Sequence, residues 1–179
     1  MAEDSIGIQE FVESYIPEMV MKRLEEKPVE GMEGTEFTLQ LTIRGEKTLT
    51  HGITIKDAKK ITVTPGRIEN PMLEVVLPDD FIRPLVDMVT SFTGRKQYDV
   101  VSKAKGSVHI KMSMPGNWEL PVTATFNGAA KPEVSIAATS ADFAAMATGE
   151  LNPPTAFMQG KVKLEGDMAF ALSLANLMP

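Results

Sequence analysis

Two stretches of the chain alternate apolar and polar side chains with a period of two, and this alternation constrains the fold more than any other feature. In residues 37–43 four apolar side chains alternate with threonine and glutamine, which is typical of a half-buried β-strand. Gly45-Glu46 predicts a turn, and three further runs continue the same inward face. The inward positions are Phe37, Leu39, Leu41, Ile43, Leu49, His51, Ile53, Ile55, Ile61, Val63, Leu73, Val75 and Leu77. We therefore expect four antiparallel strands in the first half of the chain.

The second alternating stretch predicts a hairpin. Its first strand carries apolar side chains at every second position of residues 108–114, and Pro115-Gly116-Asn117 then supplies the residues that tight turns prefer. Residues 120–126 return with the same alternation. Val134 and Ile136 predict one more strand before the C-terminal helices.

Helical periodicity predicts further elements beside the strands. Residues 8–24 place apolar side chains on one face, in two pieces kinked near Ile16, because Pro17 fits only the first turn of a second piece. Asp79 and Asp80 suit the positive N-terminal end of a helix. The apolar positions of that predicted helix are Phe81, Leu85, Met88 and Val89. A short polar helix is predicted near residues 98–103.

The composition is that of an ordinary globular protein and excludes several functions. The 179 residues fit one domain, 1–179. A formal net charge of −6, with no Lys and Arg run longer than a pair, argues against nucleic-acid binding. The absence of cysteine excludes disulfides and thiolate chemistry. The first residues lack the pattern of a signal peptide and no apolar run reaches bilayer length, so we expect a soluble, cytoplasmic protein.

The last forty residues contain closely spaced helix boundaries. Ser140 is a good N-cap for a helix that Gly149 ends. Pro154 suits the start of a single turn that Gly160 ends, and a short strand follows at residues 162–164. Asp167 caps the final helix.

That final helix, residues 168–178, is apolar on almost every side, with only Ser173 and Asn176 interrupting it. A helix of this kind must be covered all round, by protein, by a partner or by a bound apolar molecule. At the end of this sequence it could also act as a removable lid.

Five short elements in this region follow one another with the order and spacing of one known family. They are Ser140-Ala141-Asp142-Phe143, Gly149-Glu150-Leu151-Asn152-Pro153, Ala156-Phe157-Met158-Gln159-Gly160-Lys161-Val162-Lys163-Leu164, Gly166-Asp167-Met168 and Leu174-Ala175-Asn176-Leu177. A single Asn-Pro or Gly-Asp-Met means little, but five consecutive elements are specific. The chain resembles the sterol carrier protein type two family, most strongly over residues 133–179.

The resemblance implies an α+β fold in which a mainly antiparallel sheet, covered by helices, encloses an apolar tunnel. It implies binding and transfer of a fatty acid, fatty acyl-CoA, sterol or phospholipid without catalysis or a cofactor. By matching position, the lipid-binding residues would be Phe143, Met146, Phe157, Met158, Gln159, Met168, Phe170, Leu172 and Leu174. Gln159 would be the polar contact. Each of these side chains could equally belong to an ordinary core, because cores and apolar pockets use the same residue types.

The first half of the chain is longer than the family pattern, which leaves the size and entrance of the cavity open. Glu74-Val75-Val76-Leu77 resembles Glu133-Val134-Ser135-Ile136, and each is followed by an Asp-Phe pair. A degenerate repeat of residues 36–114 and 118–179 is therefore possible, although chance similarity of strand-turn-helix segments explains the pattern equally well.

Two other functions stay open. The chain could be a structural or interaction module that packs its apolar C-terminal helix on a partner. It could also be an enzyme that uses His51, on the inward face of its strand, as a base, although a buried hydrogen-bonded histidine is commoner.

No pair of metal ligands recurs at a suitable spacing, so no metal site is expected. Acidic residues on the N-terminal helix favour at most transient membrane contact.

Overall fold

The computed structural model describes residues 7–81 and 94–178, which form one eight-stranded sheet with helices on one side. The strands are β1 (Glu36–Arg44), β2 (Thr48–Lys56), β3 (Lys60–Pro65), β4 (Leu73–Pro78), β5 (Gly106–Met114), β6 (Trp118–Phe126), β7 (Glu133–Thr139) and β8 (Lys163–Gly166). The helices are α1 (Ile8–Glu10), η2 (Phe11–Tyr15), α2 (Ile16–Glu26), η3 (Asp79–Phe81), α4 (Arg95–Lys103), α5 (Ser140–Ala147), α6 (Pro153–Met158) and α7 (Met168–Ala175).

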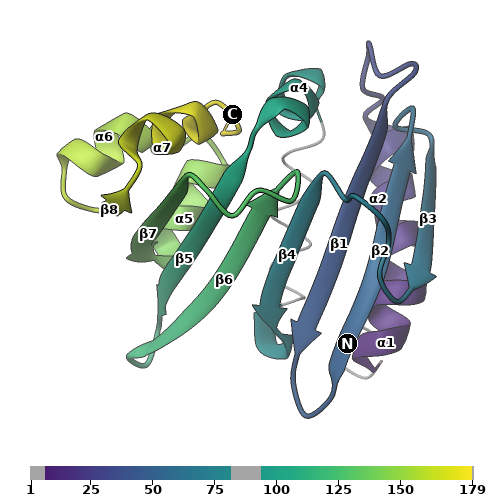
Figure 1. Cartoon of the computed structure of the whole chain (residues 1–179), viewed down its shortest axis with the longest axis horizontal. Coiled ribbons are helices and arrows are strands. Elements are labelled where there is room, and N and C mark those ends of the chain that lie inside the picture. Colours follow the sequence, from purple (N-terminus) through teal and green to yellow (C-terminus); the bar gives the residue numbers. More distant parts are fainter. Residues whose placement is uncertain (1–6, 82–93, 179) are drawn as a thin grey trace.

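The strands follow the order β3-β2-β1-β4-β6-β5-β7-β8 across the sheet. Five of the neighbouring pairs are antiparallel, whereas β1 with β4 and β5 with β7 are parallel. The α+β class with a mainly antiparallel sheet is therefore confirmed. The expectation that all four N-terminal strands are antiparallel is wrong for β4, which lies parallel to β1 (Figure 1).

The reason is a crossover that two polar side chains of β1 hold in place. The segment between β3 and β4 passes over the outer face of β1 and β2. There Gln40 Oε1 accepts a hydrogen bond from the backbone N–H of Ile68 at 2.7 Å, and Gln40 Nε2 donates to the Gly66 carbonyl at 3.2 Å. Thr38 Oγ1 accepts from the Met72 N–H at 3.0 Å. Gln40 is consequently fully buried, although the alternation places it on the polar face.

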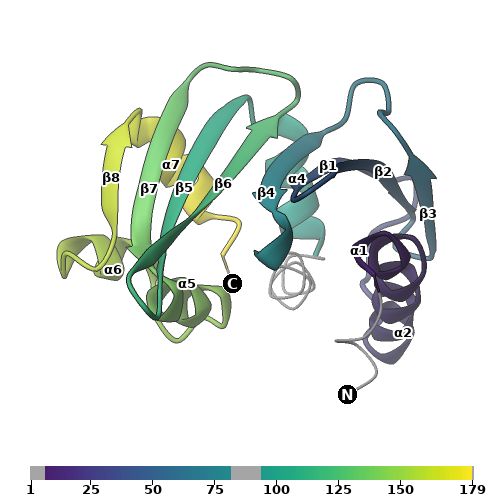
Figure 2. The same cartoon turned by 90° about the horizontal axis from the view of Figure 1, so that it is seen from below.

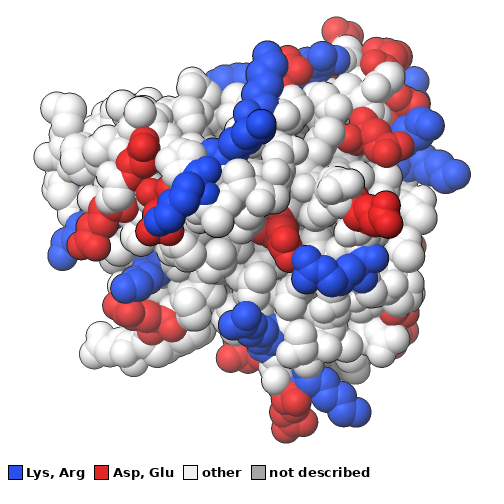
Figure 3. Space-filling view, viewed as in Figure 1, with Lys and Arg blue, Asp and Glu red and all other residues white. Residues whose placement is uncertain are grey.

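The helices lie on the concave side of the curved sheet (Figure 2). The inward positions of β1 continue in register into the other strands, since Leu41 pairs with His51 and Val75, and Val75 pairs with Ala124. The opposite face of the sheet carries scattered charges of both signs (Figure 3). The hydrophobic core therefore lies entirely between the concave face and the helices.

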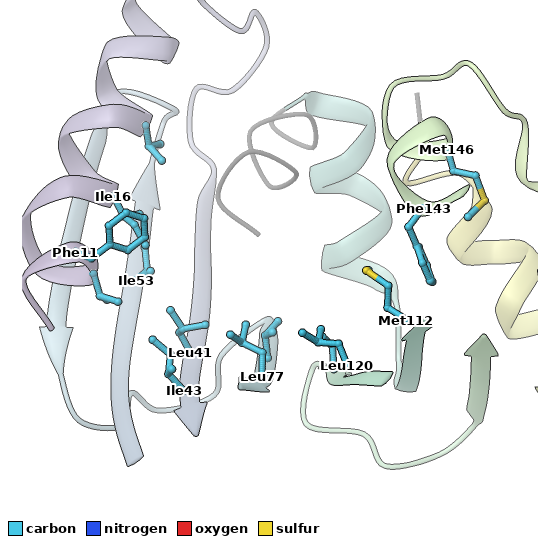
Figure 4. Packing of buried hydrophobic residues seen from close by; sticks show 14 of the residues in the cluster. Phe11, Ile16, Leu41, Ile43, Ile53, Leu77, Met112, Leu120, Phe143 and Met146 are labelled. Carbon is cyan, nitrogen blue, oxygen red and sulfur yellow. The ribbon is translucent and has the colours of Figure 1, made fainter. Parts of the chain in front are cut away.

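The N-terminal helix covers β1 to β3. It contains a π-helical turn, Phe11–Tyr15, and continues as an α-helix from Ile16. The boundary between the π-helical turn and α2 falls at Ile16, and the backbone stays helical through it, so the kink expected there stays a prediction. Pro17, which has no N–H to donate, stands in the first turn of α2. Phe11 and Ile16 face Ile53 of β2, and at the other end Phe143 of α5 faces Met112 of β5 (Figure 4).

Other sequence expectations have mixed outcomes. The hairpin of β5 and β6, the strand β7 and the short helix α4 are confirmed. Of the helix predicted after Asp79, the first turn is a 3₁₀-helix, and residues 85–89 lie outside the described residues. β4 and β7 occupy similar places, each parallel to the first strand of a preceding hairpin, but the repeat of 36–114 and 118–179 stays a prediction. So does the assignment of residues 1–179 to a single domain.

Candidate functional site

An apolar pocket of about 550 Å³ lies between the concave face of the sheet and the helices. Its floor consists of inward-facing side chains from seven strands, which the pairing register brings onto the same face. These are Phe37, Leu39, Leu41, Ile55, Leu73, Val75, Val108, Ile110, Ala124, Phe126, Ile136 and Leu164. Several of them are only partly buried in the protein itself, so the floor offers apolar surface to a bound molecule.

Both halves of the chain contribute to this pocket. Leu24 of α2 and Met32 of the following loop line it together with the inward faces of β1, β2 and β4. The strand residues were predicted to face inward and Leu24 to lie on the apolar face of its helix, but none of them was predicted to form a binding site, and the sequence analysis did not select Met32. The alternation gives the face on which a side chain lies, but it does not distinguish a filled core from a pocket.

Helix α4 supplies all the polar side chains among the described lining residues, namely Gln97 and Tyr98. The helix is held from its C-terminal end by Asn127, whose Nδ2 donates to the carbonyls of Val101 at 2.9 Å and Ala104 at 2.7 Å. At its other end Gln97 Nε2 donates to the Leu177 carbonyl at 3.4 Å, which joins α4 to the end of the chain. The sequence had given no reason to select Gln97 or Tyr98.

The C-terminal helices are positioned by side-chain caps. Asn152 Oδ1 accepts from the Thr155 N–H, and Asp167 Oδ1 accepts from the Phe170 N–H at 2.7 Å. The predicted cap at Ser140 is wrong by one residue, because Thr139 Oγ1 accepts the Asp142 N–H at 3.1 Å. Since Thr139 ends β7, the cap joins the sheet directly to α5.

Seven of the nine residues expected to bind lipid lie in the pocket lining: Phe143, Met146, Phe157, Met158, Met168, Leu172 and Leu174. Gln159 and Phe170 are not among the lining residues. Gln159 is exposed at the C-cap of α6. With 3.6 residues per turn, Phe170 lies about 200° around the axis of α7 from Met168, so the two side chains point to nearly opposite sides of the helix. Phe170 packs edge-on against Phe126, with ring centroids 6.2 Å apart.

Four of the large apolar lining side chains are also exposed to solvent, and together they form the apolar rim of the pocket. Met158 is 85% exposed, Leu172 59%, Phe157 44% and Met168 40%. They belong to α6 and α7, so the pocket opens to the surface beside these two helices. Large exposed apolar side chains in one place commonly mark an interaction surface.

His51 lies away from the pocket lining. It is 3% exposed, and its Nε2 lies 2.9 Å from Glu13 Oε1. Because a carboxylate only accepts, Nε2 carries the proton, and the buried Nδ1 has no hydrogen-bond partner among the described residues. The hydrogen bond from His51 and a second one from Gln9 lower the pKa of Glu13 below its ordinary value of 4.5. This pair joins the N-terminal helix to β2 and is not placed to act on a molecule in the pocket.

Two absences hold for the parts of the chain that the structure describes. Residues 7–81 and 94–178 contain no group of three or more His, Asp or Glu side chains arranged to hold a metal ion. Within the same ranges, no helix is both long enough and apolar enough to cross a bilayer.

Comparison with known proteins identifies the C-terminal part of the chain. The model of the SCP-2 sterol transfer family matches residues 85–179. Human sterol carrier protein 2 is 43% identical over 51 residues, which is 28% of this chain and 9% of that protein. Peroxisomal multifunctional enzyme A of Dictyostelium discoideum is 26% identical over 138 residues, 68% of this chain and 31% of that protein. The match thus spans a minor part of both relatives.

Among solved structures, the crystal structure of sterol carrier protein 2 like 2 from Aedes aegypti is similar at 17% identity and a TM-score of 0.25. The similarity covers 94% of this chain and 97% of that one. The solution structure of the sterol carrier protein domain 2 of Helicoverpa armigera is 20% identical, with a TM-score of 0.24, over 97% of this chain and 91% of that one. Since the family model matches more than half of the residues, the chain belongs to the SCP-2 sterol transfer family.

Proposed function

We propose that this protein binds a lipid in the concave pocket and transfers it between sites without changing it chemically. One observation carries the proposal: the pocket has a volume of about 550 Å³, and its described lining contains no charged side chain. Pockets of this size are typical of sites for small organic ligands. The candidate ligands are a fatty acid, a fatty acyl-CoA, a sterol and a phospholipid, as expected from the family resemblance.

The apolar lining supplies enough free energy for useful but reversible binding. Burying ~15 methylene groups at ~0.8 kcal/mol each contributes about 12 kcal/mol before losses. The loss of ligand freedom and chain flexibility consumes part of this, so a Kd near micromolar or somewhat tighter is expected. Such an affinity suits a carrier that must release its ligand.

A role without catalysis is favoured by the position of the titratable groups. His51, the only residue that the sequence suggested as a base, is engaged by Glu13 and does not line the pocket. A base must lie within hydrogen-bond reach of the proton it removes, directly or through one water. An enzyme acting on a pocket-bound lipid would therefore need a group other than His51.

We also propose that the protein is located in the cytoplasm, and cell fractionation tests this location.

Transfer requires that the ligand leave the pocket, and the apolar rim suggests where. Phe157, Met158, Met168 and Leu172 both line the pocket and reach solvent. Brief contact of this rim with a bilayer would give a lipid an apolar path between membrane and pocket. We therefore place the transient membrane contact at α6 and α7 rather than at the acidic N-terminal helix.

The same rim favours a second function, that of an interaction module without a lipid ligand. In that case α6 and α7 would pack against a partner protein or a second copy. A mass that rises with protein concentration, together with no lipid binding, would support this function.

The first experiment is extraction of natively purified protein with organic solvent, followed by mass spectrometry. A stoichiometric lipid would support the carrier and name its class, whereas protein that stays empty when offered mixed lipids would contradict it. A matched pair of variants then tests the site. Ala124→Phe fills the pocket floor from β6, while Ala137→Phe adds the same ring on the open face of β7, beside Lys111 and Lys163. Only Ala124→Phe should reduce lipid binding.

A further inference from the structure

We propose that the pocket selects ligands with a neutral hydroxyl head group over chain-matched carboxylates, and that Gln97 and Tyr98 bind the hydroxyl. The inference rests on the proposed lipid binding and specifies which lipid class the site prefers. Its basis is the distribution of polar groups in the pocket, which are few, uncharged and adjacent on one helix.

The first step concerns where a polar head can be satisfied. Apart from Gln97 and Tyr98, the described lining side chains are aliphatic, aromatic, thioether or absent, as at Gly94. A buried polar group without a hydrogen-bond partner is costly, so a polar head within the pocket is driven toward these two residues. The apolar floor of the sheet then receives the rest of the ligand.

The second step concerns the capacity of these side chains to bind. Gln97 Nε2 donates to the Leu177 carbonyl at 3.4 Å, longer than the usual range for such a bond, so little is lost when it turns to a ligand. The Gln97 amide oxygen lies over Gly94, where an added Cβ would stand 2.5 Å from it. The hydroxyl of Tyr98 makes no hydrogen bond to a described residue. An amide and a phenol together can both accept from and donate to an alcohol.

The third step concerns charge. None of the described lining residues is Asp, Glu, Lys, Arg or His. Among the described residues, Arg95 lies beside the head-group site, with its guanidinium carbon 5.7 Å from the Tyr98 ring centroid, and it is already engaged by Asp99 at 3.0 Å and by the Gly31 carbonyl at 2.8 Å. An ionised carboxylate placed in the pocket would therefore lose water without gaining a free positive charge, which is far costlier than burying a hydroxyl that finds partners.

The test compares 1-hexadecanol, hexadecanoate and hexadecane as competitors of the neutral fluorescent probe Nile red on the full-length protein at pH 7.4. We expect hexadecanol to compete at least about tenfold more strongly than hexadecanoate. Tyr98→Phe and Gln97→Leu should each weaken hexadecanol about threefold to tenfold, in line with the loss of one neutral hydrogen bond. Neither variant should weaken hexadecane. Gln159→Leu is the matched control, since Gln159 is exposed and outside the lining.

The outcomes separate this inference from the proposed function. If hexadecanoate competes as well as hexadecanol, or if both variants bind hexadecanol like the parent protein, the head-group preference is wrong while lipid binding stands. If no member of the series displaces the probe, and each remains unbound in direct titration, the proposed function is wrong and the preference fails with it. A thermal melt of each variant confirms that the compared proteins are folded.

Discussion

His51 of β2 and Glu13 of the π-helical turn are joined by a 2.9 Å contact between Nε2 and Oε1, across 38 positions of sequence. The histidine is buried, whereas the glutamate side chain is 32% exposed. The pair therefore holds the N-terminal helix against the sheet from a position next to solvent. It also gives the stability of the protein a specific dependence on pH.

Glu13→Gln should remove that dependence. The pKa of Glu13 is lowered in the folded protein by the hydrogen bonds from His51 and Gln9, so its contribution to stability is complete above the ordinary value of 4.5 and is lost as pH falls through the lowered folded pKa. We expect the difference in free energy of unfolding between the parent and Glu13→Gln to shrink below about pH 4.5. Urea unfolding between pH 7 and pH 3 measures it. Glu10→Gln, an exposed neighbour, is the control, and a difference that stays constant to pH 3 would contradict the assignment.

Asn127→Ala should destabilise the protein by about 1–3 kcal/mol, since it removes the amide that donates to three carbonyls at the end of α4 and leaves alanine at a φ of +47°. Asn127→Gly removes the same amide but tolerates the backbone conformation. Glycine should therefore cost less than alanine in urea unfolding. Equal stability of the parent and the glycine variant would show that the hydrogen bonds to α4 contribute nothing.

Phe170 and Met168 should separate stability from binding on a single helix. Phe170→Leu loses the edge-on contact with Phe126 and should lower the free energy of unfolding by about 1–2 kcal/mol. Met168→Ala removes a 40% exposed lining residue, so it should affect lipid affinity more than stability. Calorimetric unfolding and lipid titration of both variants test this. If folded Phe170→Leu loses more lipid affinity than Met168→Ala, Phe170 contributes to the binding site and this prediction is wrong.

The rim should control the rate of lipid transfer. Met158→Ser and Leu172→Ser remove exposed apolar surface at the opening, so we expect slower transfer of a fluorescent lipid between vesicles with a smaller change in equilibrium affinity. Trp118→Ser is the control, because Trp118 is 43% exposed but does not line the pocket. If all three variants transfer lipid at the parent rate, the rim is not the site of membrane contact.

Gln40 shows why the topology of the sheet could not be predicted. Its position in the alternation is polar and outward, which is correct for the strand taken alone. In the folded protein the segment from Gly66 to Met72 crosses that face, and Gln40 binds its backbone. Hydrogen bonds between parts of the chain that are distant in sequence leave no periodic pattern, so the parallel pairing of β1 and β4 became known only from the structure.

The candidate site was predicted in part for a similar reason. The motif series located Phe143, Met146, Leu174 and other lining residues, because caps and turns at fixed spacing determine the local path of the C-terminal helices. It also selected Phe170, which the helical period turns away from the pocket toward Phe126. The wall from the N-terminal half and the polar side chains of α4 lie far from the motifs in sequence.

The sequence by itself determined the strands, most of the helices, the inward face of each strand and the family, because these follow from side-chain periodicity and from local capping and turn residues. The tertiary structure decided how the two halves share one sheet and where apolar side chains leave a pocket instead of filling a core. It also decided that Gln97 and Tyr98 are the polar groups of that pocket's described lining. Packing between distant elements determines whether an apolar face is filled, and no local pattern records the volume that remains.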